Sequence, residues 1–547
     1  MLNVDHFGYF WRMTKISKGQ RYLLSILSGL LMVVSFPYTG SLTPLVFASW
    51  IPLLLVEWNI SSNRYRSGKV FIHAYLTFFL YNVGTTWWIW NASQGGAVMA
   101  FILNALLMSI AFYFFHISKK RLGASAGYLS LMILWITFEY LHYHWELSWP
   151  WLNLGNVFSI TPSIVQWYSI TGILGGTLWI LIANYFGFKI VKGIWFNKER
   201  WESHKITMMV WLLVMIVPIS VSVLQYTSYK EKSRPLEVVV VQPNIDPYNE
   251  KWVASVEQQL RKLMTLADQK VTDKTAIVIA PETAISWTFY EEDLLAMPFW
   301  GYLKERKSKW KNASFYTGAS TARYFERRNS RASRKLEDGP GFYESYNSSL
   351  LVDEKNEHTF LHKSKLVLGV EKLPFSDWFP FLEELSIENG GTSGTLGVEK
   401  EPKVLRSQNV TFAPLICYES IYGEFNAQQC RKGAEAIFII TNDGWWKDTP
   451  GYKQHMSFAR LRAIENRRSV ARSANTGTSC IINQRGDVLE KTKWWTPDVI
   501  RATINLNSNL TFYSRAGDLL GKVFSLVSLV ILSMVIAKIV KPYFSKQ

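Results

Sequence analysis

Long apolar runs occupy most of the first 226 residues of this 547-residue chain and are the feature that most constrains its fold. About seven occur there and one more lies near 517–537, and most are long enough to cross the ~30 Å hydrocarbon core of a bilayer. We place them near residues 21–36, 42–57, 70–90, 96–116, 123–143, 164–188 and 207–226. Buried core helices are the alternative, but runs of this length and number favour membrane spans. The first run lacks a small-residue cleavage site and is followed at once by another run, so we interpret it as an uncleaved helix.

Basic residues lie in alternate connections, which predicts the orientation of the spans. The clusters are Arg12, Lys15, Lys18 and Arg21; Arg64, Arg66 and Lys69; Lys119, Lys120 and Arg121; and Lys189, Lys192, Lys198, Arg200 and Lys205. The connections 36–44 and 91–96 between them carry none. By the positive-inside rule the N-terminus is cytoplasmic and the segment after seven spans lies on the outer face. We therefore expect a membrane domain over 1–226, an extracytoplasmic domain over 227–516, and a C-terminal helix with a cytoplasmic tail over 517–547.

The net charge of +17 follows largely from these clusters, so it does not predict nucleic-acid binding. The chain has only three cysteines, which cannot all pair and which lack metal-ligand spacing. Cys430 and Cys480 are expected to be buried thiols or a bridge. Neither a metal nor another cofactor is predicted.

Between Glu237 and Asn507 the pattern changes to short β-rich segments separated by polar, glycine-containing connections. The predicted strands are Glu237–Gln242, Ala276–Ala280, Ser314–Gly318, Ser348–Val352, Val410–Cys417, Ala436–Thr441, Thr478–Asn483 and Val499–Asn505, with helices near Val253–Gln269 and Gln454–Asn466. Fully apolar strands such as 238–241 and 436–440 need helices on one face and a second layer on the other, which predicts a layered α/β domain. The stretches 327–341 and 375–398 are predicted to be long loops, and loops of that length are usually functional.

Three of these segments carry chemically complementary residues. An apolar strand ends at Cys417, in the run Ala413-Pro-Leu-Ile-Cys-Tyr-Glu419, which would present a thiol at the rim of a sheet. Another apolar strand leads to Glu282, and Lys363 lies eight residues before Glu371. Glu, Lys and Cys in this order fit an acyl-transfer site.

A thiol is mostly protonated at neutral pH, so a nucleophilic cysteine needs a base or a nearby cation. Glu282 is the candidate base, and we expect partial burial to raise its pKa towards the operating range. Lys363, with backbone N–H groups after Cys417, would stabilise a tetrahedral oxyanion. Glu371 is expected to pair with Lys363, and Glu419 to do likewise from beside the nucleophile. Taken one at a time, residues of these types more often pack in a core or lie on a solvated surface than act in catalysis. Their occurrence together favours an active site.

The motifs Pro281-Glu282-Thr-Ala, Lys363-x-x-Leu-Val-x-x-x-Glu371-x-x-Pro374 and Leu415-Ile-Cys-Tyr-Glu419 resemble the Glu-Lys-Cys signatures of the nitrilase superfamily. Together with about eight spans, they make nearly the whole chain similar to the apolipoprotein N-acyltransferase family. That resemblance implies a nitrilase-like four-layer α-β-β-α sandwich on a multi-span α-helical frame. The family usually has Pro-Phe-Gly before the second glutamate, whereas this chain has Leu368-Gly-Val370 at the same spacing.

The resemblance also implies a ping-pong reaction at the cytoplasmic (inner) membrane, with the catalytic domain on the periplasmic face. A phospholipid would donate an acyl chain to Cys417 as a thioester, and the α-amine of a diacylglyceryl-cysteine apolipoprotein would accept it as an amide. Glu282 would be the general base, Lys363 the oxyanion stabiliser, and Glu371 the residue that orients Lys363. Tyr418 and Glu419 beside the nucleophile would support the site.

The remaining assignments concern substrate contacts. Trp252 matches the family by position and is a candidate wall of the acyl pocket, or else an ordinary packed tryptophan. The segment 375–385, with Trp378 and Phe379, is predicted to be a mobile lid that contacts the bilayer, because exposed aromatics of this density usually mark an interaction surface. Its alternative is packing onto the domain. His144 and Glu146 lie near a predicted membrane boundary and could face headgroups or solvent.

Two other functions compete with the acyltransferase. A membrane-tethered nitrilase-type amidase would use the same Glu-Lys-Cys set with water as acceptor, and local motifs cannot exclude it, although the eight-span frame favours a lipid substrate. A transporter with an extracytoplasmic binding domain is the second. Against it, no charged pair is evident deep in any predicted span.

Overall fold

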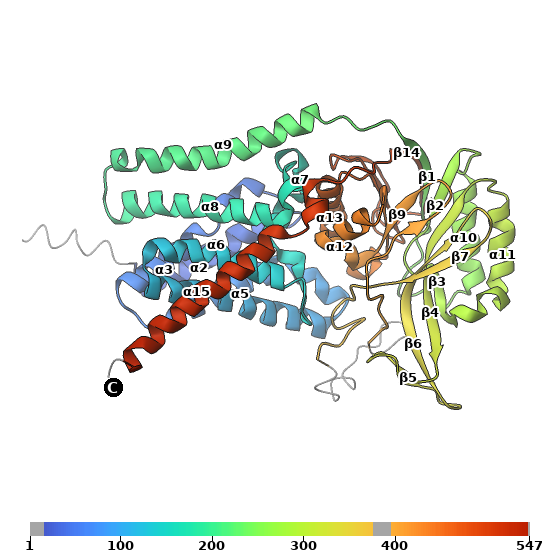
Figure 1. The fold of residues 1–547 in the computed structure, drawn as a ribbon, viewed down its shortest axis with the longest axis horizontal. Coiled ribbons are helices and arrows are strands. Elements are labelled where there is room, and N and C mark those ends of the chain that lie inside the picture. The colour runs from blue at the N-terminus through green and yellow to red at the C-terminus, as the bar shows by residue number, and fades with distance from the viewer. Residues whose placement is uncertain (1–15, 376–394, 545–547) are drawn as a thin grey trace, which may run out of the picture.

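The computed structural model describes residues 16–375 and 395–544, and its first part is a bundle of long helices (Figure 1). The bundle consists of α2 (Lys18–Ser35), α3 (Ile51–Ser62), α4 (Gly68–Thr86), α5 (Gln94–Leu122), α6 (Ala124–Leu141), α8 (Ile173–Val191), α9 (Lys205–Ser228) and α15 (Leu519–Phe544). Short helices connect them: η1 (Thr43–Phe47), η2 (Trp87–Asn91), η3 (Pro150–Leu152), η4 (Leu154–Ile160), η5 (Pro162–Ile164), α7 (Tyr168–Thr171), η6 (Lys192–Phe196) and η7 (Trp201–His204). The helix α15 returns to the bundle from the far end of the chain, as the sequence predicts.

Six helical segments in the described ranges are long and apolar enough to cross a membrane. They are Thr43–Ser62, Gln94–Leu122, Ala124–Leu141, Ile173–Phe196, Trp201–Ser228 and Leu519–Lys541. The other two of the eight expected runs form α2 and α4, which carry polar residues on the faces they bury against each other. Ser25 Oγ lies 3.0 Å from His73 Nδ1, and Thr77 Oγ1 donates to the Ser25 carbonyl at 2.9 Å. A membrane domain of helices is therefore confirmed, with a number of spans between six and the expected eight.

The predicted run 164–188 is not one continuous helix, which corrects the sequence interpretation. Gly172 has a φ of +62°, a conformation that stops α7 and lets α8 begin at Ile173. A Cβ atom at Gly172 would lie 2.4 Å from the ring of Tyr513, so the position also requires close approach. The span is consequently shorter than expected, and the residues before it form the short helices that face the second domain.

A buried charged cluster that we did not predict from the sequence lies towards one end of the bundle. Glu57 on α3 is fully buried, lies 2.7 Å from Nδ1 of His116, and also pairs with Lys119 on α5. Both helices end within a few residues of this cluster. Within the apolar segments Thr43–Ser62 and Gln94–Leu122, the cluster therefore lies in the last third of each segment and not at its centre.

Two sheets form the second domain. The eight-stranded sheet has the order β14-β1-β2-β4-β6-β5, with β3 paired to β4 and β7 paired to β6. Its strands are β1 (Pro235–Gln242), β2 (Thr275–Ile279), β3 (Ile285–Tyr290), β4 (Ser314–Phe325), β5 (Arg334–Lys335), β6 (Phe342–Val352), β7 (His358–His362) and β14 (Asp498–Asn505). The six-stranded sheet has the order β13-β12-β11-β10-β9-β8. Its strands are β8 (Leu405–Arg406), β9 (Thr411–Ile416), β10 (Ala436–Thr441), β11 (Val470–Ala474), β12 (Cys480–Ile482) and β13 (Val488–Lys491).

Alternating side chains show how the layers stack. In β1, Val238 and Val240 face the core between the two sheets, while Val239 and Val241 face the core under α10 (Val256–Asp268) and α11 (Pro298–Ser308). In β10, Phe438 enters the core between the sheets. Its neighbours on the opposite face pack towards α12 (Gly423–Arg431) and α13 (Pro450–Asn466). The predicted four-layer α-β-β-α sandwich is confirmed, and Figure 1 shows α10 and α11 on its outer side.

The two predicted loops have different outcomes. Strands β4 and β6 extend well beyond the predicted 314–318 and 348–352 and pair from Phe315 opposite Val352 to Phe325 opposite Phe342. The stretch 327–341 is thus the end of a long hairpin, with the two-residue strand β5 within it. Most of 375–398 lies outside the described residues.

Helix α13 fastens the sandwich to the helical bundle. Gln454 accepts a hydrogen bond from Trp151 Nε1 at 2.8 Å and donates to the Pro37 carbonyl at 3.0 Å. Ser457 Oγ lies 2.8 Å from Ser159 Oγ, and the neighbouring Phe458 belongs to the same apolar core as Phe158 of the bundle. The sandwich and the helices therefore meet across a buried joint.

Candidate active site

Glu282 lies just after β2, in a tight passage against the neighbouring strand β4. The N–H of Gly318 donates to the Pro281 carbonyl at 3.0 Å, and a Cβ atom at Gly318 would lie 2.4 Å from the Thr283 nitrogen. Only glycine allows this approach without displacing the backbone. The carboxylate accepts from Asn347 Nδ2 at 2.8 Å and from the Asn442 N–H at 3.0 Å. Glu282 is thus fixed by bonds from both sheets.

Lys363 follows β7 and is almost completely buried, with 1% of its side chain exposed. Its Nζ lies 2.9 Å from Oε1 of Glu371 and 3.2 Å from Oε1 of Glu282. The carboxylate of Glu371 also accepts from Asn347 Nδ2 at 2.8 Å and from the N–H of Val367 at 2.8 Å. The expected pairing of Lys363 with Glu371 is present, and Asn347 bridges the two glutamates.

Cys417 occupies the turn between β9 and the short helix η10 (Cys417–Ile421), with a φ of +51°. A positive φ is uncommon for a residue other than glycine and persists only where its surroundings hold it. Ser420 Oγ donates to the Cys417 carbonyl at 2.7 Å, and Nε2 of His455 lies 3.1 Å from the same oxygen. The strand therefore places the thiol at a sharp, restrained turn, where Cys417 is 8% exposed.

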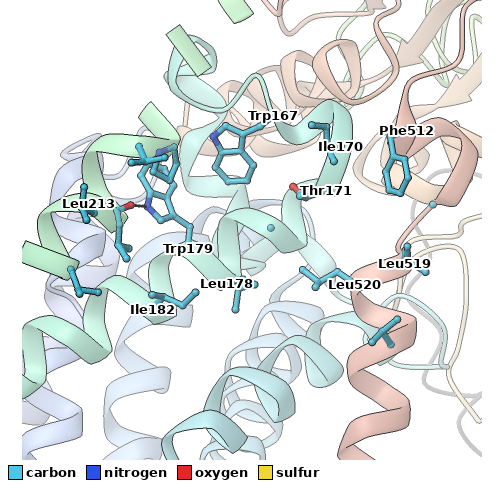
Figure 2. A pocket seen from close by; sticks show the side chains of 17 residues that line it. Trp167, Ile170, Thr171, Leu178, Trp179, Ile182, Leu213, Phe512, Leu519 and Leu520 are labelled. Atoms are coloured by element: carbon cyan, nitrogen blue, oxygen red, sulfur yellow. Dashed lines mark hydrogen bonds between the residues drawn. The ribbon is translucent and has the colours of Figure 1, made fainter. Parts of the chain in front are cut away.

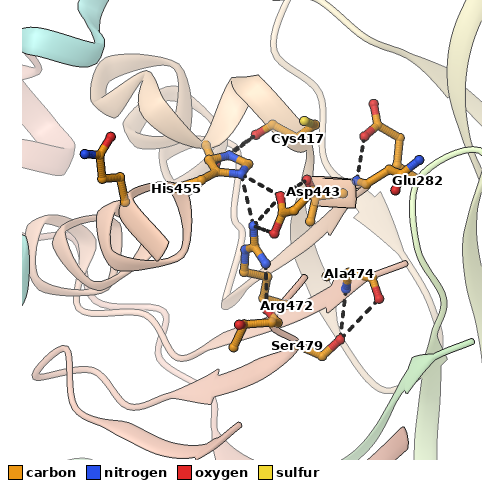
Figure 3. A network of polar contacts seen from close by, with 12 residues as sticks. Glu282, Cys417, Asp443, His455, Arg472, Ala474 and Ser479 are labelled. Carbon is orange, nitrogen blue, oxygen red and sulfur yellow. Dashed lines mark hydrogen bonds and ion pairs between the residues drawn. The ribbon is translucent and has the colours of Figure 1, made fainter. Parts of the chain in front are cut away.

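A buried network supports this turn from below (Figure 3). Asp443 accepts from Arg472 Nη2 at 2.8 Å and lies 3.1 Å from Nδ1 of His455, with all three side chains fully buried. Burial alone raises the pKa of Asp443, but Arg472 and His455 outweigh it and lower the pKa to about 2. The carboxylate stays ionised and holds His455 under the carbonyl of Cys417.

The protonation states differ from the sequence expectation. Burial raises the pKa of the Glu282 carboxyl, but the charge of Lys363, the amide of Asn347 and the charge of Lys251 outweigh it and lower that pKa. The expected increase is therefore wrong, because the neighbouring cations could not be counted from the sequence. Burial, and after it Glu282, raises the pKa of the Cys417 thiol well above its ordinary range. The resting site thus combines an ionised carboxylate with a neutral thiol.

Glu419 has partners other than the expected one, and Tyr418 contacts the membrane domain. Among the described residues, the Glu419 carboxylate makes no ion pair with Lys363. Instead it accepts from the N–H groups of Ser364 at 2.6 Å and Ile416 at 2.8 Å. Burial raises the pKa of Glu419 to about 7, and these N–H groups act against the increase. Glu419 therefore ties the backbone after Lys363 to the end of β9, while Tyr418 donates to the Ser148 carbonyl at 3.2 Å.

One pocket of about 170 Å³ brings Glu282, Lys363, Glu371 and Cys417 together. Its lining is Ala92, Lys251, Trp252, Glu282, Thr283, Thr288, Ser320, Tyr346, Asn347, Lys363, Val367, Val370, Glu371, Leu396, Cys417, Asn442, Trp445 and Trp446. Trp252 is among the residues that line it. Trp378 and Phe379 lie outside the described residues. Because Ala92 follows η2 of the membrane domain, both domains contribute to this pocket.

A larger cavity of about 730 Å³ lies apart from this pocket, between α8, α9 and the start of α15 (Figure 2). Side chains such as Trp167, Trp179, Leu213 and Leu520 line it, and none of its lining residues is titratable. The larger cavity therefore lacks the groups that acyl transfer needs. The smaller pocket is the candidate active site.

The other two cysteines are free and buried, so the bridge considered between Cys430 and Cys480 is absent. Within the part of the chain that the structure describes, no group of histidine, cysteine or acidic side chains has the arrangement of a metal site.

Sequence reasoning gave no role to three residues that contact Glu282 or its neighbours. Asn347 and Asn442 hold the Glu282 carboxylate, and Lys251 bonds to the Thr283 hydroxyl. Burial lowers the pKa of Lys251 to about 8, although Glu282 acts against the decrease. The segments 241–252, 346–348 and 441–445 that contain these residues could be recognised as motifs, but only the fold shows what they contact.

Two family models match separate parts of the chain. Residues 237–509 match the carbon-nitrogen hydrolase family, which covers both sheets and the candidate site. Residues 28–186 match the apolipoprotein N-acyltransferase N-terminal domain. Each model therefore matches a different one of the two structural parts.

Curated relatives extend the likeness over the whole length. The apolipoprotein N-acyltransferase of Chlorobaculum tepidum is 31% identical over 511 residues, which are 91% of this chain and 93% of that protein. The apolipoprotein N-acyltransferase of Geobacter metallireducens is 26% identical over 510 residues, 91% of this chain and 92% of that one. Apolipoprotein N-acyltransferase 1 of Treponema denticola is 25% identical, over 94% of this chain and 96% of its own. With a helical bundle, a carbon-nitrogen hydrolase sandwich and near-complete coverage by such relatives, the chain belongs to the apolipoprotein N-acyltransferase family.

Proposed function

We propose that this protein moves a fatty acyl chain from a phospholipid, through a thioester on Cys417, to the α-amine of the diacylglyceryl cysteine of an apolipoprotein. Membership of the family supports this reaction. The observation that carries the proposal is the single pocket in which Glu282, Lys363 and Cys417 meet beside Ala92 of the membrane domain. No cofactor is needed, because every group in the reaction comes from the chain or its substrates.

In the first half-reaction, the sulfur of Cys417 attacks the ester carbonyl of the phospholipid. Since the thiol is neutral and Glu282 is ionised, the thiol proton passes to Glu282 as the S–C bond forms. Lys363 offsets the negative charge that develops on the carbonyl oxygen. The C–O bond then breaks, Glu282 returns the proton to the departing glycerol oxygen, and a lysophospholipid leaves.

In the second half-reaction, the α-amine of the lipid-modified cysteine attacks the thioester carbonyl. Glu282 accepts a proton from the attacking nitrogen and later gives it to the sulfur of Cys417 as the C–S bond breaks. An amide forms and the free thiol is restored. Glu371 holds Lys363 in place throughout, because its carboxylate accepts from Lys363 at 2.9 Å.

The membrane frame suits these substrates, since both are anchored in a lipid leaflet. We assign residues 1–226 to the membrane domain, 227–516 to a periplasmic catalytic domain, and 517–547 to the returning helix and its cytoplasmic tail, in the cytoplasmic (inner) membrane. Two contacts at opposite ends of the helices support this orientation. Gln454 of the catalytic domain contacts the bundle at Pro37, whereas the basic residues Arg21 and Lys69 lie over Tyr65 at the other end, which the positive-inside rule places in the cytoplasm. A cysteine introduced at Asn329 should react with a membrane-impermeant reagent in intact spheroplasts. Reaction only after lysis would reverse the assignment.

Two substrate contacts belong to the same proposal. Trp252 would form one wall of the acyl pocket, and the segment with Trp378 and Phe379 would contact the bilayer as a lid. Replacing Trp378 and Phe379 with serine should lower activity on phospholipid vesicles with little change in melting temperature. A large fall in melting temperature would instead support packing of these rings into the core.

Product release separates an acyltransferase from a hydrolase with the same residues. Purified protein and phospholipid alone should release about one equivalent of lysophospholipid per Cys417 and then stop. Addition of a diacylglyceryl-cysteine peptide should start continuous release and yield the N-acylated peptide. Continuous release of fatty acid without an acceptor would support the amidase alternative.

A further inference from the structure

The segment 145–149, between α6 and η3, reaches from the membrane domain to both sides of the active site. The carboxylate of Glu146 lies 3.0 Å from Lys372 Nζ and 3.1 Å from Arg331 Nη1. Two residues later, the Ser148 carbonyl accepts from Tyr418, and its hydroxyl lies 3.0 Å from the Tyr422 hydroxyl. One contact thus leads towards Lys363, and the others lead to the residues after Cys417.

Lys372 cannot move independently of its neighbour Glu371. The N–H groups of Glu371 and Lys372 both donate to the Val367 carbonyl, at 2.9 and 3.2 Å. The N–H of Gly369 donates back to the Lys372 carbonyl at 2.9 Å, and Val367 itself donates to the Glu371 carboxylate at 2.8 Å. Residues 367–372 therefore form a closed loop. A force on the side chain of Lys372 displaces the carboxylate that holds Lys363.

The ion pair is shielded from solvent more than an ordinary surface pair. The side chains of Glu146 and Lys372 are 34% and 17% exposed, and Glu146 joins two cations from separate segments. Burial lowers the pKa of Lys372, and Glu146 acts against that decrease. Exposed single pairs contribute little, but removing one member of a shielded pair leaves the other charge uncompensated. The contact therefore adds a restraint on the loop from the membrane domain.

We propose that Glu146 is a positioning residue for acyl transfer, which holds Lys372 and Glu371 and thereby fixes Lys363 where the oxyanion forms. This inference rests on the proposed function, because it needs Lys363 to act on a substrate. The membrane domain would then both anchor the enzyme in the bilayer and contribute to the chemistry. The placement of the catalytic cation depends on a side chain from the other domain.

Charge exchange tests the contact directly, with hydroxylamine-labile acylation by labelled phospholipid as the readout. Glu146→Gln keeps the shape of the side chain and should lower kcat for acylation about tenfold with KM for phospholipid unchanged. Glu146→Lys places a cation beside Arg331 and Lys372 and should lower kcat about a hundredfold. The double variant Glu146→Lys/Lys372→Glu should recover at least tenfold over Glu146→Lys, because the pair is restored with reversed charges. The control is Glu401→Gln, which breaks an exposed pair with Lys432 and should leave kcat unchanged.

The outcomes distinguish this inference from the proposed function. Wild-type rates for Glu146→Gln, or no recovery in the charge-exchanged double variant, would overturn the positioning role while leaving the acyltransferase intact. Absence of acylation in the wild-type protein would overturn the proposed function, and this inference with it. If Glu146→Gln aggregates, Lys372→Met removes the same contact from the other domain. It should show the same tenfold loss, and a wild-type kcat for that variant would overturn the inference.

Discussion

The Nζ atom of Lys363 lies 3.2 Å from Oε1 of Glu282 in a pocket where both side chains are more than nine-tenths buried. Each charge lowers the cost of burying the other, so both remain ionised without contact with bulk water. Because Glu371 takes a second hydrogen of the same ammonium group, Lys363 is directed by two carboxylates at once. The general base and the oxyanion-stabilising cation are therefore a single electrostatic unit in this account.

Lys363→Ala should reduce acylation of Cys417 by ~10²–10³-fold, the usual loss for one oxyanion donor. The same change should raise the pKa of Glu282, because the largest neighbouring charge that lowers it is removed. A base with a raised pKa is protonated at higher pH, so the acidic limb of the pH–rate profile should move upward. Single-turnover acylation between pH 4 and pH 8 measures both effects. An unchanged acidic limb would show that Lys363 does not control Glu282.

Gly318→Ala should displace Glu282 and lower acylation about tenfold or more, since the new Cβ would lie 2.4 Å from the Thr283 nitrogen. The matched control is Gly301→Ala on α11, where an added Cβ meets no atom within 4 Å. Alanine in a helix is more favourable than glycine by roughly 0.5–1 kcal/mol, so the control should be active and slightly more stable. Acylation rate and melting temperature of both variants provide the comparison. Equal activity of the two would contradict the close approach of β4 to Glu282.

Asp443→Leu should destabilise the catalytic domain by about 3–5 kcal/mol, because it leaves the buried Arg472 without its carboxylate. His455 would also lose the partner that holds it under the Cys417 carbonyl, so acylation should fall as well. Asp448→Leu is the control, since that carboxylate is 62% exposed and pairs with the partly exposed Lys453. Denaturant unfolding monitored in detergent measures the difference. A similar effect of both changes would show that the network does not support the turn.

The sequence was most informative for the two strands that lead to Glu282 and Cys417. The apolar strands before Glu282 and Cys417 lie within a residue or two of their predicted ends, and both side chains reach the same pocket. The strand β11 was missed, because the pattern Val-Ala-Arg-Ser-Ala does not resemble a buried strand until Asp443 is known to pair with Arg472. Long-range pairing of this kind leaves no local pattern.

The same limit explains the errors at the site. The pKa of Glu282 depends on Lys251 and Lys363, which are distant in the chain, and the bridge made by Asn347 depends on the pairing of β4 with β6. Before Glu371, where the family usually has Pro-Phe-Gly, Gly369 takes a φ of +79° in the closed loop. The short spacing in the chain was enough to predict that Glu371 pairs with Lys363. Contacts with residues from distant parts of the chain could not be predicted from the sequence.

The mass of the Cys417 peptide shows whether this residue carries the acyl chain. Purified wild-type protein and the Cys417→Ala variant are incubated with labelled phospholipid and no apolipoprotein, then digested and examined by mass spectrometry. We expect one acyl chain on Cys417 of the wild-type protein, removable by hydroxylamine, and no label in the variant, since a thioester needs that sulfur. Label of equal intensity in Cys417→Ala, or an acyl chain on Cys430, Cys480 or a serine, would contradict it.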